Sequence, residues 1–129
     1  LIAVVDDEPE ILDGMHTLLS QWGCETVCTE TLEEATQGLI RHARRPDAFL
    51  VDYRLREGVS GISVIQDLQA RFGTDIPAVI ITGETAPDSL REVSGSGYQQ
   101  IHKPLAPARL YQLLSELITS RKDKRGRVS

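Results

Sequence analysis

The sequence predicts one α/β domain built on an open parallel sheet, and two observations carry this prediction. Five short apolar runs alternate with segments of helical periodicity along the 129 residues. The runs are too uniformly apolar for strands with one solvent-exposed face, and are typical of strands buried on both faces. Right-handed crossovers between such strands place helices on both faces of the sheet. The five runs are LIAVV (1–5), ETVC (25–28), AFLV (48–51), AVII (78–81) and QQIH (99–102), the last being weak.

The first two helices have clear start signals. The first follows Pro9, a residue that suits the first turn, and Gly23 suits its end. Its apolar residues recur at helical spacing: Ile11, Leu12, Met15, Leu18, Leu19 and Trp22. The second helix begins at Thr31, and Glu34 three residues later completes a capping box.

Three further helices complete the alternation. The third runs from about Ser60 to Phe72, and the fourth is short and weak after Pro87. The fifth follows Pro107 and carries a leucine-rich stripe. No linker divides the chain, so we expect one domain over residues 1–120 and a frayed polar tail over residues 121–129.

Composition excludes several classes of protein. The net charge of −5 argues against nucleic-acid binding by this domain. No apolar run approaches the roughly 20 residues that cross a bilayer, and no signal-peptide pattern is present. On one strand, Cys24 and Cys28 would lie about 13 Å apart, too far for a disulfide, which fits a reducing, cytoplasmic setting. Because the chain opens at Leu1 inside an apolar run, we expect it to be cut from a longer protein.

Polar side chains follow four of the five apolar runs. In an open α/β sheet, ligands bind beyond the carboxyl ends of the strands, so these side chains are expected to meet at one edge. The residues are Asp6, Asp7 and Glu8 after the first run, Asp52 after the third, Thr82 after the fourth and Lys103 after the fifth.

This combination predicts phosphoryl chemistry. Clustered carboxylates need a positive partner, and Mg²⁺ accepts one or two carboxylates while keeping some waters. A lysine and a threonine beside the cation match the oxygens of a phosphoryl group, which leaves Asp52 free as a nucleophile. Each residue also has a structural interpretation. Asp7 and Glu8 suit a helix cap and first turn, and an isolated aspartate, threonine or lysine at such a position is usually a turn or surface residue.

Four motifs resemble the receiver domain of two-component response regulators. They are VVDDE (4–8), LVDYRL (50–55), VIITG (79–83) and HKPL (102–105), and the resemblance covers nearly the whole length. It implies a flavodoxin-like, doubly wound (βα)5 sheet with strand order 2-1-3-4-5. It also implies that the domain accepts a phosphoryl group from the phosphohistidine of a histidine kinase or phosphotransfer domain.

The resemblance assigns the phosphoryl acceptor and its cation. Asp52 would receive the phosphoryl group and contact Mg²⁺. Asp7 would bind Mg²⁺ directly and Asp6 mainly through water. The backbone carbonyl of Arg54 would complete the protein ligands.

The remaining roles concern phosphoryl recognition and its lifetime. Thr82 would hydrogen-bond the phosphoryl group, and Lys103 would pair with it. The bond before Pro104 is expected to be cis. Arg54 and Glu84, each two residues after a site residue, occupy positions that tune the rate of phosphate loss.

One position departs from the family. Receivers usually carry Tyr or Phe three residues before the lysine, as a ring that swings inward on activation, and here that residue is Gln100. Tyr98 shares its strand face but is not the same site. Phosphorylation is still expected to alter the face made by the fourth helix, fifth strand and fifth helix.

Three longer stretches are similar to receivers at the C-terminal end of hybrid sensor histidine kinases: DYRLREGVSG (52–61), ITGETAP (81–87) and SGYQQIHKPLAPARL (96–110). The full-length protein would then contain a kinase, whereas this domain would only phosphorylate and dephosphorylate itself. The alternatives are the receiver of a separate response regulator, a magnesium-dependent aspartate-nucleophile phosphatase, or a docking module without chemistry. Arg54 stands where such phosphatases usually need an acid. The sequence leaves open whether the domain forms a homodimer.

Overall fold

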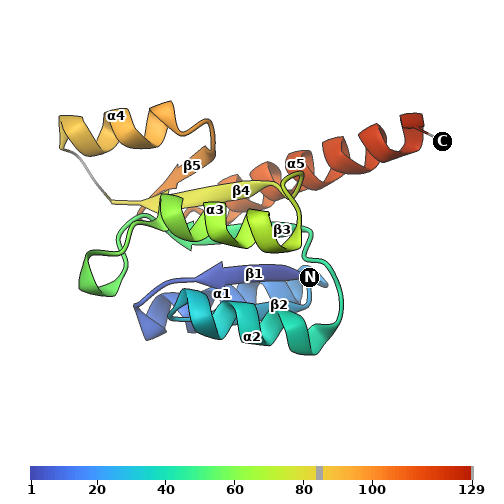
Figure 1. Cartoon of the computed structure of the whole chain (residues 1–129), viewed down its shortest axis with the longest axis horizontal. Coiled ribbons are helices and arrows are strands. Elements are labelled where there is room, and N and C mark those ends of the chain that lie inside the picture. Colours follow the sequence, from blue (N-terminus) through green and yellow to red (C-terminus); the bar gives the residue numbers. More distant parts are fainter. Residues whose placement is uncertain (84–85, 129) are drawn as a thin grey trace.

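A five-stranded parallel sheet forms the centre of the protein, with helices on both faces (Figure 1). The computed structural model describes residues 1–83 and 86–128, with side chains as far as Thr119. The strand order is β2-β1-β3-β4-β5, which confirms the predicted doubly wound fold class. The strands are β1 (Ile2–Val5), β2 (Thr26–Thr29), β3 (Ala48–Asp52), β4 (Ala78–Thr82) and β5 (Gln99–His102).

Five α-helices cover the sheet in two layers. They are α1 (Pro9–Gln21), α2 (Leu32–His42), α3 (Gly61–Phe72), α4 (Pro87–Gly95) and α5 (Pro107–Val128), with a short 3₁₀ turn, η1, at Arg56–Gly58. Residues of α1 and α5 pack on one face, and residues of α2, α3 and α4 pack on the other. Among the described residues, no helix combines the length and apolar character needed to cross a membrane. The predicted tail, residues 121–129, stays a prediction, because the side chains beyond Thr119 lie outside the described part.

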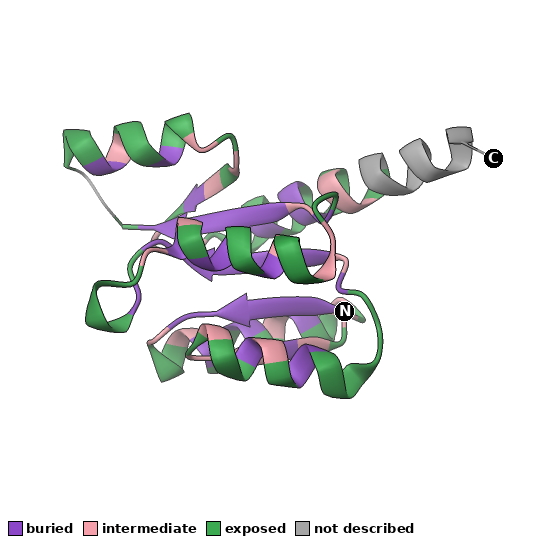
Figure 2. Ribbon diagram, in the orientation of Figure 1, coloured by how far each residue is buried: buried purple, intermediate pink, exposed green. Residues whose placement is uncertain are grey.

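The three central strands explain the uniformly apolar runs. Every residue of β1, β3 and β4 is buried (Figure 2). Successive side chains point to opposite faces, so Phe49 and Val51 enter the core under α2 and α3, while Leu50 enters the core under α1 and α5. Because both faces need apolar side chains, the runs show no alternation with polar residues.

The capping box at the start of α2 forms with one difference from the usual pattern. The Thr31 hydroxyl accepts a hydrogen bond from the Glu34 backbone N–H at 3.2 Å, as predicted. The Glu34 carboxylate reaches the Thr31 hydroxyl, also at 3.2 Å, where a capping box would have it reach the Thr31 backbone N–H. The capping box therefore predicted the start of α2 correctly, but one of its two expected hydrogen bonds has a different partner atom.

The connection from β3 to α3 is unusually tight. The Gly61 N–H donates to the Tyr53 carbonyl at 2.7 Å, which draws the first turn of α3 against the end of β3. A Cβ atom on Gly61 would lie 2.1 Å from the Asp52 carbonyl oxygen and 2.9 Å from its carbon. Only glycine permits this approach. Because Gly61 has no side chain, the start of α3 can pack directly against the backbone of Asp52 and help to hold it.

We predict that Gly61→Ala destabilises the protein by about 3 kcal/mol or more, because the new methyl group must displace the backbone of Asp52. Urea unfolding followed by circular dichroism measures this change. Gly14→Ala on α1 is the matched control. A Cβ at Gly14 meets nothing within 4 Å, so that variant should be more stable by about 0.5–1 kcal/mol. Equal stability of Gly61→Ala and the wild type would contradict the tight connection.

Candidate functional site

The predicted site residues gather at the carboxyl edge of the sheet. Asp52 ends β3 opposite Ile81 of β4, and Thr82 ends β4 opposite His102 of β5. Thr82 is buried, with 1% of its surface exposed, and its carbonyl accepts the Lys103 backbone N–H at 2.9 Å. The ladder between β4 and β5 therefore continues one residue past β5 and fixes the backbone of Lys103 beside Thr82.

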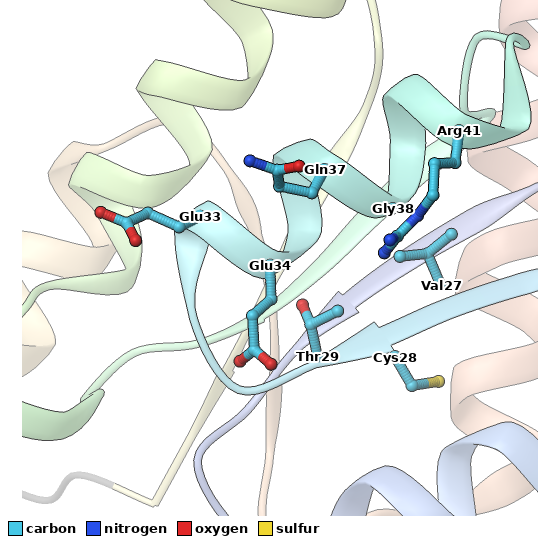
Figure 3. Close-up of a pocket in the computed structure, with 8 residues that line it drawn as sticks. All are labelled: Val27, Cys28, Thr29, Glu33, Glu34, Gln37, Gly38 and Arg41. Carbon is cyan, nitrogen blue, oxygen red and sulfur yellow. The ribbon is translucent and has the colours of Figure 1, made fainter.

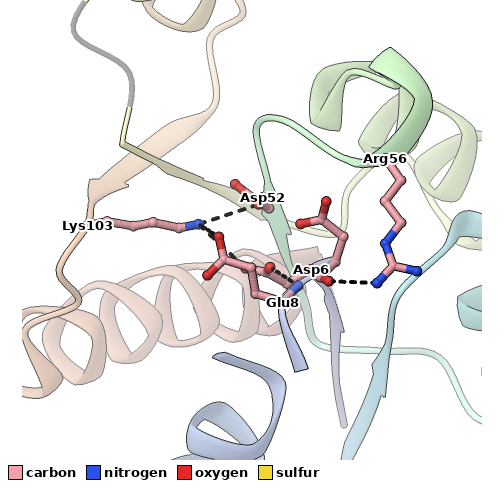
Figure 4. Close-up of polar contacts among 6 residues, drawn as sticks. Asp6, Glu8, Asp52, Arg56 and Lys103 are labelled. Atoms are coloured by element: carbon pink, nitrogen blue, oxygen red, sulfur yellow. Dashed lines mark hydrogen bonds and ion pairs between the residues drawn. The ribbon is translucent and has the colours of Figure 1, made fainter. Parts of the chain in front are cut away.

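One ammonium group faces three carboxylates at this edge (Figure 4). The Nζ atom of Lys103 lies 3.5 Å from Oδ2 of Asp52, where it donates a hydrogen bond. It also lies 3.5 Å from Oε1 of Glu8 and 4.0 Å from Oδ2 of Asp6. A single cation cannot neutralise three anions, so the cluster keeps an excess of negative charge.

Burial makes this excess costly. Asp52 is 5% exposed, and burial first, then the nearby Asp6 carboxylate, raise its pKa to about 6, although Lys103 opposes the shift. Burial also raises the pKa of Asp6. For Lys103, burial lowers the pKa, but the carboxylates of Asp52, Asp6 and Glu8 together outweigh it and raise the pKa.

Asp6 has the most demanding position of the three acids. Its side chain is fully buried, and Oδ1 accepts the Glu8 backbone N–H at 2.9 Å. Its Oδ2 atom makes no hydrogen bond within the described part of the chain. A buried carboxylate oxygen that has only a distant ion pair and no hydrogen bond is rare and unfavourable, so Asp6 retains an unfilled capacity to bind a cation or donor.

Three consecutive acids could hold a hard divalent cation. Asp6, Asp7 and Glu8 each offer a carboxylate oxygen, and these oxygens lie within 4.8 Å of one another. Oxygen donors, the absence of a hydrogen bond to Oδ2 of Asp6 in the described chain, and the raised pKa of Asp52 all fit Mg²⁺. The predicted ligand set named Asp6, Asp7, Asp52 and the Arg54 carbonyl, and the structure adds Glu8 as a neighbouring donor.

Sequence reasoning did not predict the contacts of two residues near this edge. Glu8 was expected at the edge and also suited a first-turn acid, but its carboxylate pairs with Lys103 and its backbone N–H donates to Asp6. Arg56 of η1 donates to the Asp7 carbonyl at 3.3 Å (Figure 4). It also pairs with Glu30 at 3.6 Å. No sequence pattern signals Arg56, because its reach depends on the fold of η1.

Four predicted modulating residues lie in different surroundings. The side chain of Arg54 turns toward α4, where Nη2 donates to Ser89 Oγ at 3.3 Å. Gln100 is half-buried on β5, opposite Ile80. The bond between Lys103 and Pro104 is cis, as the resemblance implies. Glu84 lies outside the described residues.

A separate depression of about 540 Å³ lies over α2 and the edge strand β2 (Figure 3). Its polar side chains include Glu33, Glu34 and Arg41, and Arg41 extends from α2 toward Val27 (Figure 3). None of the predicted site residues lines it. The predicted site residues therefore lie apart from this depression, at the carboxyl edge of the sheet.

Comparison with known proteins agrees with this geometry. The family model for the response regulator receiver domain matches residues 2–115. The response regulator protein PilR of Pseudomonas aeruginosa is 28% identical over 119 residues, which are 92% of this chain and 26% of that protein. The chain spans between about a quarter and a half of the length of the curated relatives it matches.

Solved structures show the same fold. NtrX from Brucella abortus is 26% identical, with a TM-score of 0.80 over 97% of this chain and 28% of that one. A CheY-like receiver domain protein from Methanospirillum hungatei JF-1 is 20% identical, with a TM-score of 0.80 over 95% of this chain and 96% of that one.

The raised pKa of Asp52 predicts the pH dependence of stability without divalent cations. Between the ordinary value of 3.8 and the folded value of about 6, the folded state holds a proton that the unfolded state has released. The free energy of unfolding should therefore fall as the pH rises through this window, by on the order of 3 kcal/mol for Asp52. Urea unfolding between pH 4 and 7 measures the slope. Asp52→Asn should flatten it, and Asp67→Asn, an exposed change on α3, should not. Parallel curves for Asp52→Asn and the wild type would contradict the assignment.

Proposed function

The chain belongs to the response regulator receiver domain family, and from this premise we propose that it is a magnesium-dependent signalling switch in which Asp52 accepts a phosphoryl group. The observation that carries the proposal is the buried Asp52 carboxylate, held 3.5 Å from Lys103 beside an acidic cluster. The donor would be a phosphohistidine on a histidine kinase or a phosphotransfer domain. The P–N bond to histidine breaks as an Asp52 oxygen forms the new P–O bond.

The residues of the chain supply most of what this transfer needs. With a pKa of about 6, the Asp52 carboxylate is mainly ionised at neutral pH and can act as the nucleophile. Lys103 already faces Asp52, so its ammonium can pair with the phosphoryl oxygens without a large movement. Thr82 ends the neighbouring strand β4, and its hydroxyl would hydrogen-bond the phosphoryl group. When bound by Asp6, Asp7 and Asp52, Mg²⁺ would neutralise charge that develops on the phosphoryl oxygens.

Two other functions fit the site less well. An aspartate-nucleophile phosphatase usually needs a second acid two residues after the nucleophile. That residue is Arg54, and its side chain contacts α4. A docking module without chemistry would not need Asp6, Asp52 and Lys103 to be kept together at an energetic cost.

The kind of full-length protein that contains this domain is a second question, with two candidate answers. The stretches over 52–61, 81–87 and 96–110 favour the C-terminal receiver of a hybrid sensor histidine kinase. The curated relatives PilR and AruR, a response regulator and a transcriptional regulatory protein by name, favour the receiver of a separate regulator. Sequencing the gene upstream of the codon for Leu1 decides between them, since only a hybrid kinase encodes a kinase core there.

We predict one phosphoryl adduct per chain after incubation with acetyl phosphate and Mg²⁺, because Asp52 is the acceptor and Lys103 pairs with the incoming group. Intact mass spectrometry detects the adduct. Asp52→Ala should lose it, and the matched control Asp67→Ala should keep it. Steady release of phosphate from the donor with no adduct would instead indicate a phosphatase.

We further predict that Asp7→Ala abolishes Mg²⁺ binding and adduct formation together. The variant should also be more stable without Mg²⁺, by on the order of 1 kcal/mol, because repulsion among the acids is relieved. Calorimetric titration and urea unfolding measure the two effects. Asp13→Ala, an exposed change on α1, is the control. Unchanged Mg²⁺ affinity in Asp7→Ala would place the cation elsewhere.

A further inference from the structure

Helix α4 is weakly anchored in this structure. Its buried residues are Ser89 and Val93, and only Val93 joins the apolar core. By comparison, α1 buries Leu12, Met15 and Leu19. A helix with so little apolar contact depends on its polar contacts for position. For α4 those contacts centre on Ser89, which is 7% exposed.

Ser89 connects α4 to the two residues that follow Asp52. The Arg54 guanidinium donates to its hydroxyl at 3.3 Å. The Tyr53 hydroxyl has Ser89 and Glu92 as polar neighbours, since all three residues line the same depression, and burial raises the pKa of Tyr53. The Arg54 guanidinium also lies 5.7 Å from the centre of the Tyr53 ring, within the range of a cation–π contact. We call Tyr53, Arg54, Ser89 and Glu92 the Ser89 link.

The Ser89 link has a rigid end and a weakly held end. The Tyr53 backbone is hydrogen-bonded on both sides, from its N–H to the Ile81 carbonyl at 2.9 Å and from the Gly61 N–H to its carbonyl at 2.7 Å. The α4 end borders a depression of about 500 Å³ that separates the helix from the β3–α3 connection. A displacement of the backbone at Asp52 therefore passes to α4 through side chains, with room for the helix to shift.

The usual ring switch has no equivalent at its position here. Gln100 stands where receivers carry Tyr or Phe. The ring of Tyr98 is tied to the other end of α3, because its hydroxyl donates to Oε1 of Gln69 at 3.1 Å. Gln69 in turn donates to the Ile76 carbonyl at 2.8 Å. Tyr98, which directly precedes β5, thus braces this segment against α3, and a different route to α4 is needed.

We propose that the Ser89 link is this route, so that phosphorylation of Asp52 changes the position of α4 through Tyr53 and Arg54. The inference rests on the proposed function for its trigger, but the link itself exists in the resting protein. At rest it holds α4 against the β3–α3 connection. A phosphoryl group on Asp52 moves this connection, and the change in the hydrogen bond between Arg54 and Ser89 then releases or re-aims the helix.

Ser89→Ala tests the resting link, because it removes the hydroxyl to which the Arg54 guanidinium donates, next to Tyr53. Hydrogen exchange read by mass spectrometry should show the α4 amides exchanging about fivefold faster or more, with α3 unchanged. Ser94→Ala, an exposed serine change on the same helix, should leave α4 exchange as in the wild type. Equal α4 exchange in Ser89→Ala and Ser94→Ala would overturn the proposal.

A second arm tests transmission, with acetyl phosphate and Mg²⁺ as the probe and intact mass as an independent check on the adduct. In the wild type and Ser94→Ala, the adduct should change α4 exchange. Ser89→Ala should form the adduct to the same extent but lose at least half of the α4 response. A full response in Ser89→Ala, or no response in the adduct of the wild type, would overturn the route while leaving the proposed function intact. Absence of any adduct would overturn the proposed function. The comparison of α4 exchange in unphosphorylated Ser89→Ala and Ser94→Ala would still test the Ser89 link.

Discussion

The burial of Asp6 and Asp52 at neighbouring strand ends, with Lys103 as their shared cation, is an unfavourable arrangement that the rest of the structure must hold in place. Desolvation raises the pKa of both acids, and one oxygen of Asp6 lacks a hydrogen bond within the described chain. Such a cluster persists only where the surrounding fold is strong enough to hold it. The fully buried strands β1, β3 and β4 provide that strength, since their apolar side chains fill the cores on both faces of the sheet.

The backbone, more than any side-chain contact, fixes the spacing of these groups. Parallel pairing sets Asp52 one register step from Thr82, and the Thr82 carbonyl holds the Lys103 backbone. On the other side, Gly61 lets α3 press on the carbonyl of Asp52. In the proposed function, a cation and a phosphoryl group would therefore bind among these charged groups without a rearrangement of the sheet.

The sequence predicted the fold and the carboxyl-edge cluster well, because both follow from short-range patterns. Uniform apolar runs identify strands buried on both faces, and each run leads directly into its polar residue, as Asp52 does after AFLV. Contacts that depend on loop geometry were not predictable. Arg56 reaches Asp7 only because η1 folds back, and Arg54 turns toward a serine 35 residues away. The pairing of Glu8 with Lys103 was not predicted for a different reason, since an acid at the start of a helix also suits the helix dipole.

The acidic cluster and helix α4 differ in how firmly they are held, and this difference explains how such a domain could switch. The acidic cluster is rigidly held and energetically unsatisfied, so a new charge at Asp52 has a large local effect. Helix α4 contributes a single apolar residue to the core, so only a small free energy opposes its displacement. A shift in equilibrium needs a ligand whose interactions differ between two states. In the proposed switch, the hydrogen bond between Arg54 and Ser89 of α4 is the contact that would give the phosphoryl group this difference, although Gln100 offers no ring to move.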